Sequence, residues 1–163
     1  MIVIEGLDNS GKSTLARVIA QSSKFEIQES EGPPKYEGEI EERINRYLES
    51  PNKIYVRHPV ISNPIYSQAR GDSWQLDPAL RQRFYDLRPL LIYCDPGTRG
   101  LGDHQIKDHD TPEHLAVIEA NYSKILFMYR NWAADHALIN YRIGDHYLPI
   151  ITLCEMWHRG SVC

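Results

Sequence analysis

A short run near the start of the chain has the residue types and spacing of a phosphate-binding loop. Residues 6–13 read Gly-Leu-Asp-Asn-Ser-Gly-Lys-Ser, which matches the full P-loop pattern of two spaced glycines followed by Lys and Ser. The two glycines let backbone N–H groups turn inward around an anion, and the N-terminus of a following helix adds partial positive charge. The pattern predicts that this loop holds the phosphates of ATP.

The side chains of the loop have separate expected tasks. Lys12 should reach the β- and γ-phosphates, and the Ser13 hydroxyl should help to hold Mg²⁺, which prefers oxygen ligands. Asp8 lies inside the loop, where a carboxylate can also serve only to shape the turn by local hydrogen bonding. The expected ATP-binding residues of this segment are Gly6, Asp8, Asn9, Ser10, Gly11, Lys12, Ser13 and Thr14.

The elements that position this loop alternate between strand and helix patterns. Met1–Ile4 is a short apolar run typical of a strand covered on both faces, and a helix with one apolar face should follow it. We expect strands at 1–4, 25–28, 54–56, 90–94 and 138–142, and helices at 12–22, 36–49, 77–87 and 110–135, with a short C-terminal helix. Residues 59–75 look like a loop with a possible short helix, and residues 96–109 look like a mobile, lid-like loop.

This alternation predicts an α/β fold with one domain over residues 1–163. The expected architecture has three layers, namely a five-stranded parallel sheet with helices on both faces, as in P-loop kinases. Ligands of such sheets bind beyond the carboxyl ends of the strands. Three segments should therefore meet at one edge: the loop after Ile4, Arg57 at the end of the middle strand, and the loop after Cys94.

Composition limits the partners and the compartment. A net charge of −4 gives no field that would gather a nucleic acid polymer, so such a substrate is not favoured. No apolar run approaches the ~20 residues that span a bilayer, so no membrane partner is expected. Cys94, Cys154 and Cys163 show neither metal-ligand nor disulfide spacing. A reducing cytoplasm is the expected compartment, or the host cytoplasm for a viral protein.

The segment Ile4–Thr14, IEGLDNSGKST, resembles the opening of thymidylate kinases, which is more specific than the P-loop pattern alone. Two later segments are similar to that family in the same order. Val56-Arg57-His58 stands where the family ends its middle strand with Asp-Arg and then an aromatic residue or His. Leu91–Pro96 stands where a family strand ends in Asp before the lid. The short chain looks like the compact nucleotide kinases of tailed phages.

The resemblance implies roles for residues outside the loop. Arg57 would grip the acceptor phosphate, Arg99 in the lid-like loop would neutralise the transferring phosphoryl group, and Arg142 would lie where related kinases close over adenine. The implied catalytic residues are Lys12, Arg57, Asp8 and Arg99, and the implied acceptor-binding residues are Asp8, Arg57, Tyr66, Gln68 and Arg70. For Tyr66, Gln68 and Arg70, an ordinary surface loop is an equally open interpretation. A homodimer is also implied, since thymidylate kinases are commonly dimers.

The chain departs from the family pattern at Val56, where the family has a carboxylate associated with the metal or the acceptor. Valine cannot take that role, which leaves Asp8, Asp95 or Glu31 as replacements, or a metal held mainly through water. The departure weakens the assignment to dTMP more than the assignment to a kinase.

Three functions follow from these observations. The first is an ATP- and Mg²⁺-dependent kinase of (deoxy)nucleoside monophosphates, with dTMP as the first candidate acceptor. The second is a deoxynucleoside kinase, whose chemistry needs a carboxylate base near the sugar and is disfavoured by Val56. The third is a P-loop binding or regulatory module with little transferase activity.

Overall fold

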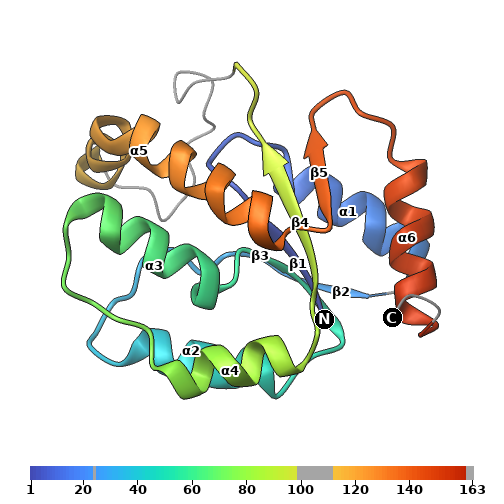
Figure 1. Ribbon diagram of the computed structural model, residues 1–163, viewed down its shortest axis with the longest axis horizontal. Coiled ribbons are helices and arrows are strands. Elements are labelled where there is room, and N and C mark those ends of the chain that lie inside the picture. Colours follow the sequence, from blue (N-terminus) through green and yellow to red (C-terminus); the bar gives the residue numbers. More distant parts are fainter. Residues whose placement is uncertain (24, 99–111, 161–163) are drawn as a thin grey trace.

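The computed structural model describes residues 1–23, 25–98 and 112–160, with the elements arranged as in Figure 1. Strands and helices alternate along most of this length. The strands are β1 (Ile2–Glu5), β2 (Glu26–Gln28), β3 (Lys53–Val56), β4 (Leu90–Asp95) and β5 (Ile139–Arg142). The helices are α1 (Lys12–Ser23), α2 (Glu39–Leu48), α3 (Pro59–Arg70), α4 (Pro78–Asp86), α5 (Pro112–His136) and α6 (Leu148–His158).

The strands form one parallel sheet in the order β2-β3-β1-β4-β5. In register, Val3 of β1 lies opposite Tyr55 on one side and Leu91 on the other, and Cys94 of β4 lies opposite Tyr141 of β5. Since β1 is central, the loop that follows it opens between the carboxyl ends of β3 and β4. This order places the P-loop at the middle of the ligand-binding edge.

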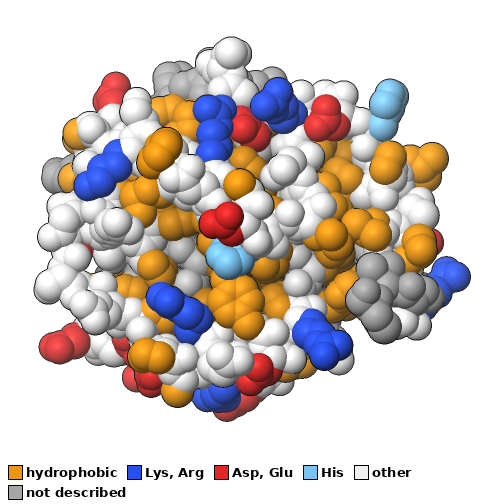
Figure 2. All heavy atoms as spheres, viewed as in Figure 1, with side chains coloured by type: hydrophobic (Ala, Val, Ile, Leu, Met, Phe, Trp, Pro, Cys, Tyr) orange, Lys and Arg blue, Asp and Glu red, His pale blue; other side chains and the backbone are white. Residues whose placement is uncertain are grey.

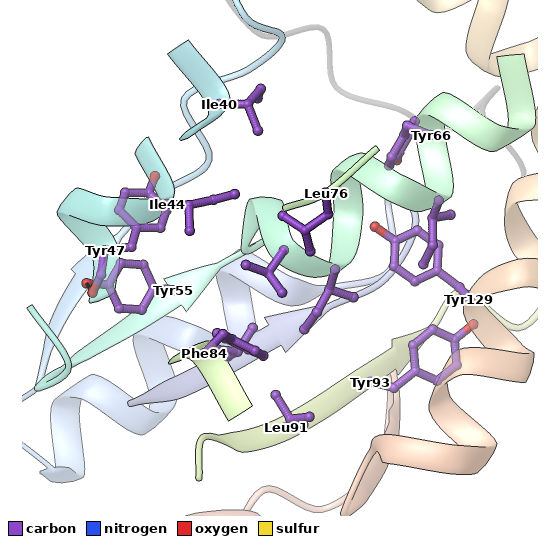
Figure 3. Close-up of a cluster of buried hydrophobic side chains, with 14 of the residues drawn as sticks. Ile40, Ile44, Tyr47, Tyr55, Tyr66, Leu76, Phe84, Leu91, Tyr93 and Tyr129 are labelled. Carbon is purple, nitrogen blue, oxygen red and sulfur yellow. Dashed lines mark hydrogen bonds between the residues drawn. The ribbon is translucent and has the colours of Figure 1, made fainter. Parts of the chain in front are cut away.

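Two apolar clusters cover the two faces of the sheet. On one face, alternate strand residues such as Val3, Tyr55 and Leu91 pack with α2, α3, α4 and α5 (Figure 3). On the other face, residues such as Ile4 and Ile92 pack with α1 and α6. Figure 1 shows the same separation, with α1 and α6 on one side of the strands. The predicted parallel five-stranded sheet with helices on both faces is confirmed.

The prediction of a loop with a possible short helix over residues 59–75 was wrong about the length of the helix, because α3 occupies Pro59–Arg70. His58 caps its start, Pro59 occupies the first turn, where a missing N–H costs little, and Gly71 ends it in the left-handed conformation. Pro64 inside the helix removes one backbone hydrogen bond. The burial of five side chains of α3 offsets that loss. They are Val60, Ile61, Ile65, Tyr66 and Ala69. The prolines and polar residues of the segment obscured this apolar pattern in the sequence.

Charged side chains of both signs are interspersed with apolar ones on the face drawn in Figure 2. Among the residues that the structure describes there, basic groups form no continuous patch on this face. None of the described helices combines the length and apolar character needed to cross a bilayer, although α5 has 25 residues.

Candidate functional site

The P-loop joins β1 to α1 through backbone conformations that need glycine at two positions. Gly6 has φ +142°, and a Cβ there would lie 2.3 Å from the carbonyl oxygen of Cys94. Gly11 has φ +84°, and a Cβ there would lie 2.8 Å from Cγ1 of Ile143. The loop can follow this path only because both residues lack a Cβ, which would otherwise clash with neighbouring atoms.

Lys12 is folded into this loop, with only 7% of the residue exposed. Its Nζ donates a hydrogen bond to the Leu7 carbonyl and lies 3.3 Å from the Ser10 hydroxyl. Burial, together with the nearby charge of Arg57, lowers the pKa of Lys12 to about 7. The negative charge of a bound polyphosphate would raise the pKa of Lys12 again and favour its protonated, positively charged form.

A hydroxyl and a carboxylate meet at the start of α1. Ser13 Oγ donates to Oε2 of Glu29 at 3.0 Å, and Glu29 directly follows β2. Oxygen atoms of these two kinds fit Mg²⁺, so Ser13 and Glu29 are the residues suited to hold it beside the phosphates. Within the described part of the chain, no group of three or more His, Cys, Asp or Glu side chains forms a metal site by itself.

Arg57 crosses from the end of β3 to the P-loop. Its Nη2 donates to Oδ1 of Asp8 at 2.7 Å, and its guanidinium carbon lies 5.3 Å from the centre of the Tyr66 ring. Burial disfavours the charge, but the Asp8 carboxylate outweighs burial and raises the pKa of Arg57 further above its ordinary value. Asp8 also accepts a 3.4 Å hydrogen bond from the Tyr66 hydroxyl. The structure thus brings three predicted site residues into one cluster.

A pocket opens beside this cluster and continues to the P-loop. Five of the residues predicted as catalytic or acceptor-binding line it together. They are Asp8, Lys12, Arg57, Tyr66 and Arg70. The segment 30–34 and further residues of α2 and α3 also line the pocket, including Arg43, Tyr47, Ser62 and Asn63. Because Lys12 belongs to both the P-loop and the pocket wall, a donor and an acceptor phosphate could meet there.

The pocket wall from α2 contains a buried cation that the sequence analysis did not select. Arg43 is 5% exposed and donates to the Gly32 carbonyl at 2.8 Å and to Glu39 at 2.5 Å. Beside it, Glu31 accepts hydrogen bonds from Arg46 and from the Tyr47 hydroxyl, the latter at 2.7 Å. These contacts satisfy much of the polar wall from within the protein, so the wall is preformed.

Other predicted residues lie away from the pocket. Gln68 is exposed on α3 and does not line it. Arg142 lies in a separate groove with Tyr93 and Arg130, with its Nη2 3.9 Å from Asp95. Thr14 is exposed on α1, and Arg99 falls outside the described residues, as does the lid-like segment from 99 onward. The roles of these residues stay predictions.

The carboxylates proposed to replace the one missing at Val56 are already engaged. Asp8 binds Arg57, Glu31 binds Arg46, and Asp95 accepts two hydrogen bonds from Arg130 at 3.1 and 3.0 Å. Burial opposes ionisation of Asp95, but these hydrogen bonds and that from Gly97 keep its pKa below the usual range. The carboxylate that does touch Ser13 is Glu29, one strand away from Val56.

Two further buried groups lie behind the site. Glu5 is fully buried, and burial raises its pKa to about 7 although the backbone N–H of His58 stabilises the carboxylate. Burial lowers the pKa of His58 to about 3, so this residue is neutral. The His58 ring packs against Phe84 at 4.5 Å, and its Nδ1 accepts the Val60 N–H as the cap of α3.

Signals for the missed residues were present in the sequence. Arg43 stands on the apolar stripe formed by Ile40, Ile44 and Tyr47, where a charged residue indicates a buried, paired group. Glu29 follows a predicted strand, and the carboxyl ends of parallel strands share one edge. Glu5 follows the apolar run 1–4, but nothing in the sequence shows which donors it meets.

No protein-family model matches the chain, and no curated protein matches it. Solved structures do share its fold. The YorR protein of Bacillus subtilis, in complex with phosphorylated GDP, is similar with a TM-score of 0.68 at 21% identity over 97% of each chain. Deoxyadenosine kinase from M. mycoides, with the products dCMP and a flexible dCDP bound, gives a TM-score of 0.59 at 17% identity over 98% of each chain.

The same M. mycoides kinase with bound dATP gives a TM-score of 0.57 at 15% identity, over 97% of this chain and 98% of that one. At these identities the likeness shows the fold, and it confirms the predicted three-layer P-loop kinase architecture. The pocket geometry described above therefore sits at the ligand-binding edge of a known type of sheet.

Proposed function

We propose that the protein is an ATP-dependent nucleoside-monophosphate kinase that acts on deoxynucleotides, with dTMP as the first candidate acceptor. The observation that carries this proposal is that Arg57 and Arg70 line the same pocket as Lys12 of the P-loop. Two arginines in an acceptor pocket suit a dianionic phosphate, because guanidinium groups bind phosphate oxygens through paired hydrogen bonds. The structural neighbours named above as binding or acting on nucleotides give independent support.

The reaction needs positioning and neutralisation of charge more than covalent help. An oxygen of the acceptor phosphate forms a bond to the γ-phosphorus of ATP while the bond to the β–γ bridging oxygen breaks, and ADP leaves. Arg57, oriented by Asp8, would fix the attacking phosphate, and Lys12 would stabilise charge on the β- and γ-phosphates. Mg²⁺, held beside Ser13 and Glu29, would neutralise phosphate charge when bound.

A deoxynucleoside kinase is the second candidate, favoured by two observations. Glu29 supplies a carboxylate at the strand ends in spite of Val56, and such a base is what phosphorylation of a hydroxyl requires. One of the structural neighbours is a deoxyadenosine kinase. Against it stands the presence of Arg57 and Arg70 in the pocket, since a neutral nucleoside has no phosphate for these arginines to bind.

A coupled ADP-release assay tests both candidates. The purified protein, ATP and Mg²⁺ are combined with each ribo- and deoxynucleoside monophosphate and with each free nucleoside. We expect turnover with deoxynucleoside monophosphates, dTMP among them. Turnover confined to free nucleosides would support the second candidate. ADP release that stays at background with every acceptor would contradict both and would favour a P-loop binding or regulatory module.

A further inference from the structure

The turn between β3 and α3 holds Arg57 in an uncommon backbone conformation. Arg57 has φ +69°, in the left-handed region that costs a non-glycine residue about 1–2 kcal/mol. Its own N–H donates to the carbonyl of Ile4 in β1 at 3.0 Å. A strained turn at a ligand-binding edge persists only where surrounding contacts fix it. The turn therefore needs a second contact on the other side of the Arg57 carbonyl, at His58.

Glu5 provides that contact from the end of β1. Its Oε1 accepts the backbone N–H of His58 at 2.6 Å, and its Oε2 accepts the Tyr129 hydroxyl of α5 at 3.1 Å. The residue is fully buried, and a carboxylate removed from water costs several kcal/mol unless hydrogen bonds compensate it. A group so costly to bury is informative, because an apolar residue would satisfy packing alone at less cost.

Contacts from Glu5 and Asp8 enclose Arg57 from both ends. Backbone N–H groups on each side of its carbonyl are bound by β1, while its guanidinium reaches Asp8 at 2.7 Å over the Tyr66 ring. Tyr66 in turn meets Tyr129 edge-to-face, with ring centres 6.2 Å apart (Figure 3). A chain of contacts therefore runs from Glu5 through Tyr129, Tyr66 and Asp8 to the Arg57 guanidinium. The hydrogen bond from the next residue, His58, to Glu5 closes it.

We propose that Glu5 is the positioning residue for Arg57: by accepting the His58 N–H, it holds the turn that aims the guanidinium at Asp8 and at the acceptor pocket. The part of this inference that concerns catalysis rests on the proposed function, in which Arg57 binds the acceptor phosphate. The geometric part does not, because it concerns the conformation of Arg57 alone.

Two substitutions separate the hydrogen bond of Glu5 from its charge. In Glu5→Gln the amide oxygen still accepts the His58 N–H, whereas Glu5→Met fills a similar volume and accepts nothing. With ATP and dTMP, or the monophosphate with the highest turnover, we expect kcat/KM for the acceptor to fall about 100-fold in Glu5→Met. In Glu5→Gln it should stay within about threefold of wild type, and KM for ATP should change little in both.

Either of two results would overturn the proposal. An unchanged acceptor kcat/KM in Glu5→Met would show that the turn does not need the contact. Equal losses in Glu5→Gln and Glu5→Met would show that the charge matters and the hydrogen bond does not. Tyr129→Phe is the matched comparison, because it removes the second hydrogen bond of Glu5 and leaves the one to His58. Its loss should be smaller than that of Glu5→Met.

A readout without substrate distinguishes failure of this inference from failure of the proposed function. The Nε–H of Arg57 is buried, so its NMR signal should exchange slowly with water in the wild type and in Glu5→Gln. In Glu5→Met the protection should be lost, whether or not any acceptor is phosphorylated. Retained protection would overturn the inference. Should Glu5→Met fail to fold, Glu5→Asp replaces it, because a side chain about 1.5 Å shorter cannot reach both donors.

Discussion

The P-loop and the pocket beside it share Lys12 and Asp8 but are built in different ways. The P-loop comes from consecutive residues, and its path is fixed by backbone conformation at Gly6 and Gly11. Besides these two residues, the pocket draws its groups from the segment 30–34, α2, the end of β3 with the turn after it, and α3. It depends on side-chain contacts such as that of Arg57 with Asp8. A backbone cradle recognises phosphate in general, whereas a wall of side chains can choose a particular acceptor.

Lys12 is where the two regions meet, so its loss should have the largest effect. We expect Lys12→Ala to lower turnover by about 1000-fold or more with every acceptor, because the charge on the β- and γ-phosphates loses its stabilising partner. ADP release under saturating ATP measures this. Lys53→Ala, which removes a part-exposed partner of Glu26, is the matched control and should behave as wild type. Appreciable activity in Lys12→Ala would separate the P-loop from the chemistry.

Arg57→Lys tests whether the pocket acts through side-chain geometry. The substitution keeps the charge but loses the planar fork, so kcat/KM for the acceptor should fall about 100-fold. Nucleotide affinity, measured by titration calorimetry with ADP, should be unchanged because the P-loop cradle is intact. Arg159→Lys, at the exposed C-terminal cap of α6, serves as the control. A parallel loss of ADP affinity would mean that the two regions are not separable as described.

Glu29→Gln separates two roles that this one carboxylate could have. If Glu29 only assists Mg²⁺ near Ser13, phosphorylation of a monophosphate should fall about tenfold, with a higher Mg²⁺ requirement. If it is the base for a hydroxyl acceptor, turnover of free nucleosides should fall further, by about 100-fold or more. Rates over a Mg²⁺ series with both acceptor types decide. Glu26→Gln, on β2 and exposed, is the control.

Titration of His58, which packs behind the pocket, should have the smallest effect on turnover. It should change the stability of the fold alone. Its pKa is about 3 in the folded protein against an ordinary value of 6.5, so the unfolded chain binds the extra proton between these pH values. The unfolding free energy should therefore fall as pH drops from 6.5 to 3, with a contribution of up to about 1.4 kcal/mol per pH unit. Denaturant unfolding across this range measures it.

The control for this prediction is His58→Asn, which can still cap α3 but does not titrate. Glu5 contributes with the opposite sign, because its raised pKa lets the folded protein bind the proton first, and that contribution is lost as pH rises through about 7. Since both proteins contain Glu5, the difference between their pH curves isolates His58. Parallel curves would contradict the assignment of a neutral, buried histidine.

The sequence allowed the sheet and the P-loop to be predicted because both depend on local signals. Apolar runs such as Met1–Ile4 and Leu90–Cys94 identify buried strands, and the P-loop pattern is contiguous. The helix α3 was predicted only as a possible short helix, because Pro59 and Pro64 are local signals against a helix. Its stability comes from burial against α5 and the sheet, which no local pattern reports.

The pocket could be predicted only where a residue stands at a strand end. Arg57 meets that condition and lines the pocket, and Asp8 lines it because of its place in the P-loop pattern. Arg43 was not assigned to the pocket wall, because its role follows from how α2 packs against the segment 30–34. Partner choice among charged side chains is a tertiary property, so spacing alone could not supply it.

The close approach of Gly6 to the Cys94 carbonyl has a consequence for how the protein is assembled during synthesis. The residues of the P-loop are synthesised before the β4 backbone against which Gly6 packs, because that backbone lies some ninety residues later along the chain. Until then β1 has only β3 as a neighbour. A nascent chain that ends before β4 would contain all residues of the P-loop pattern but would lack the β4 backbone that encloses the loop. Nucleotide binding should therefore begin only after β4 has been synthesised.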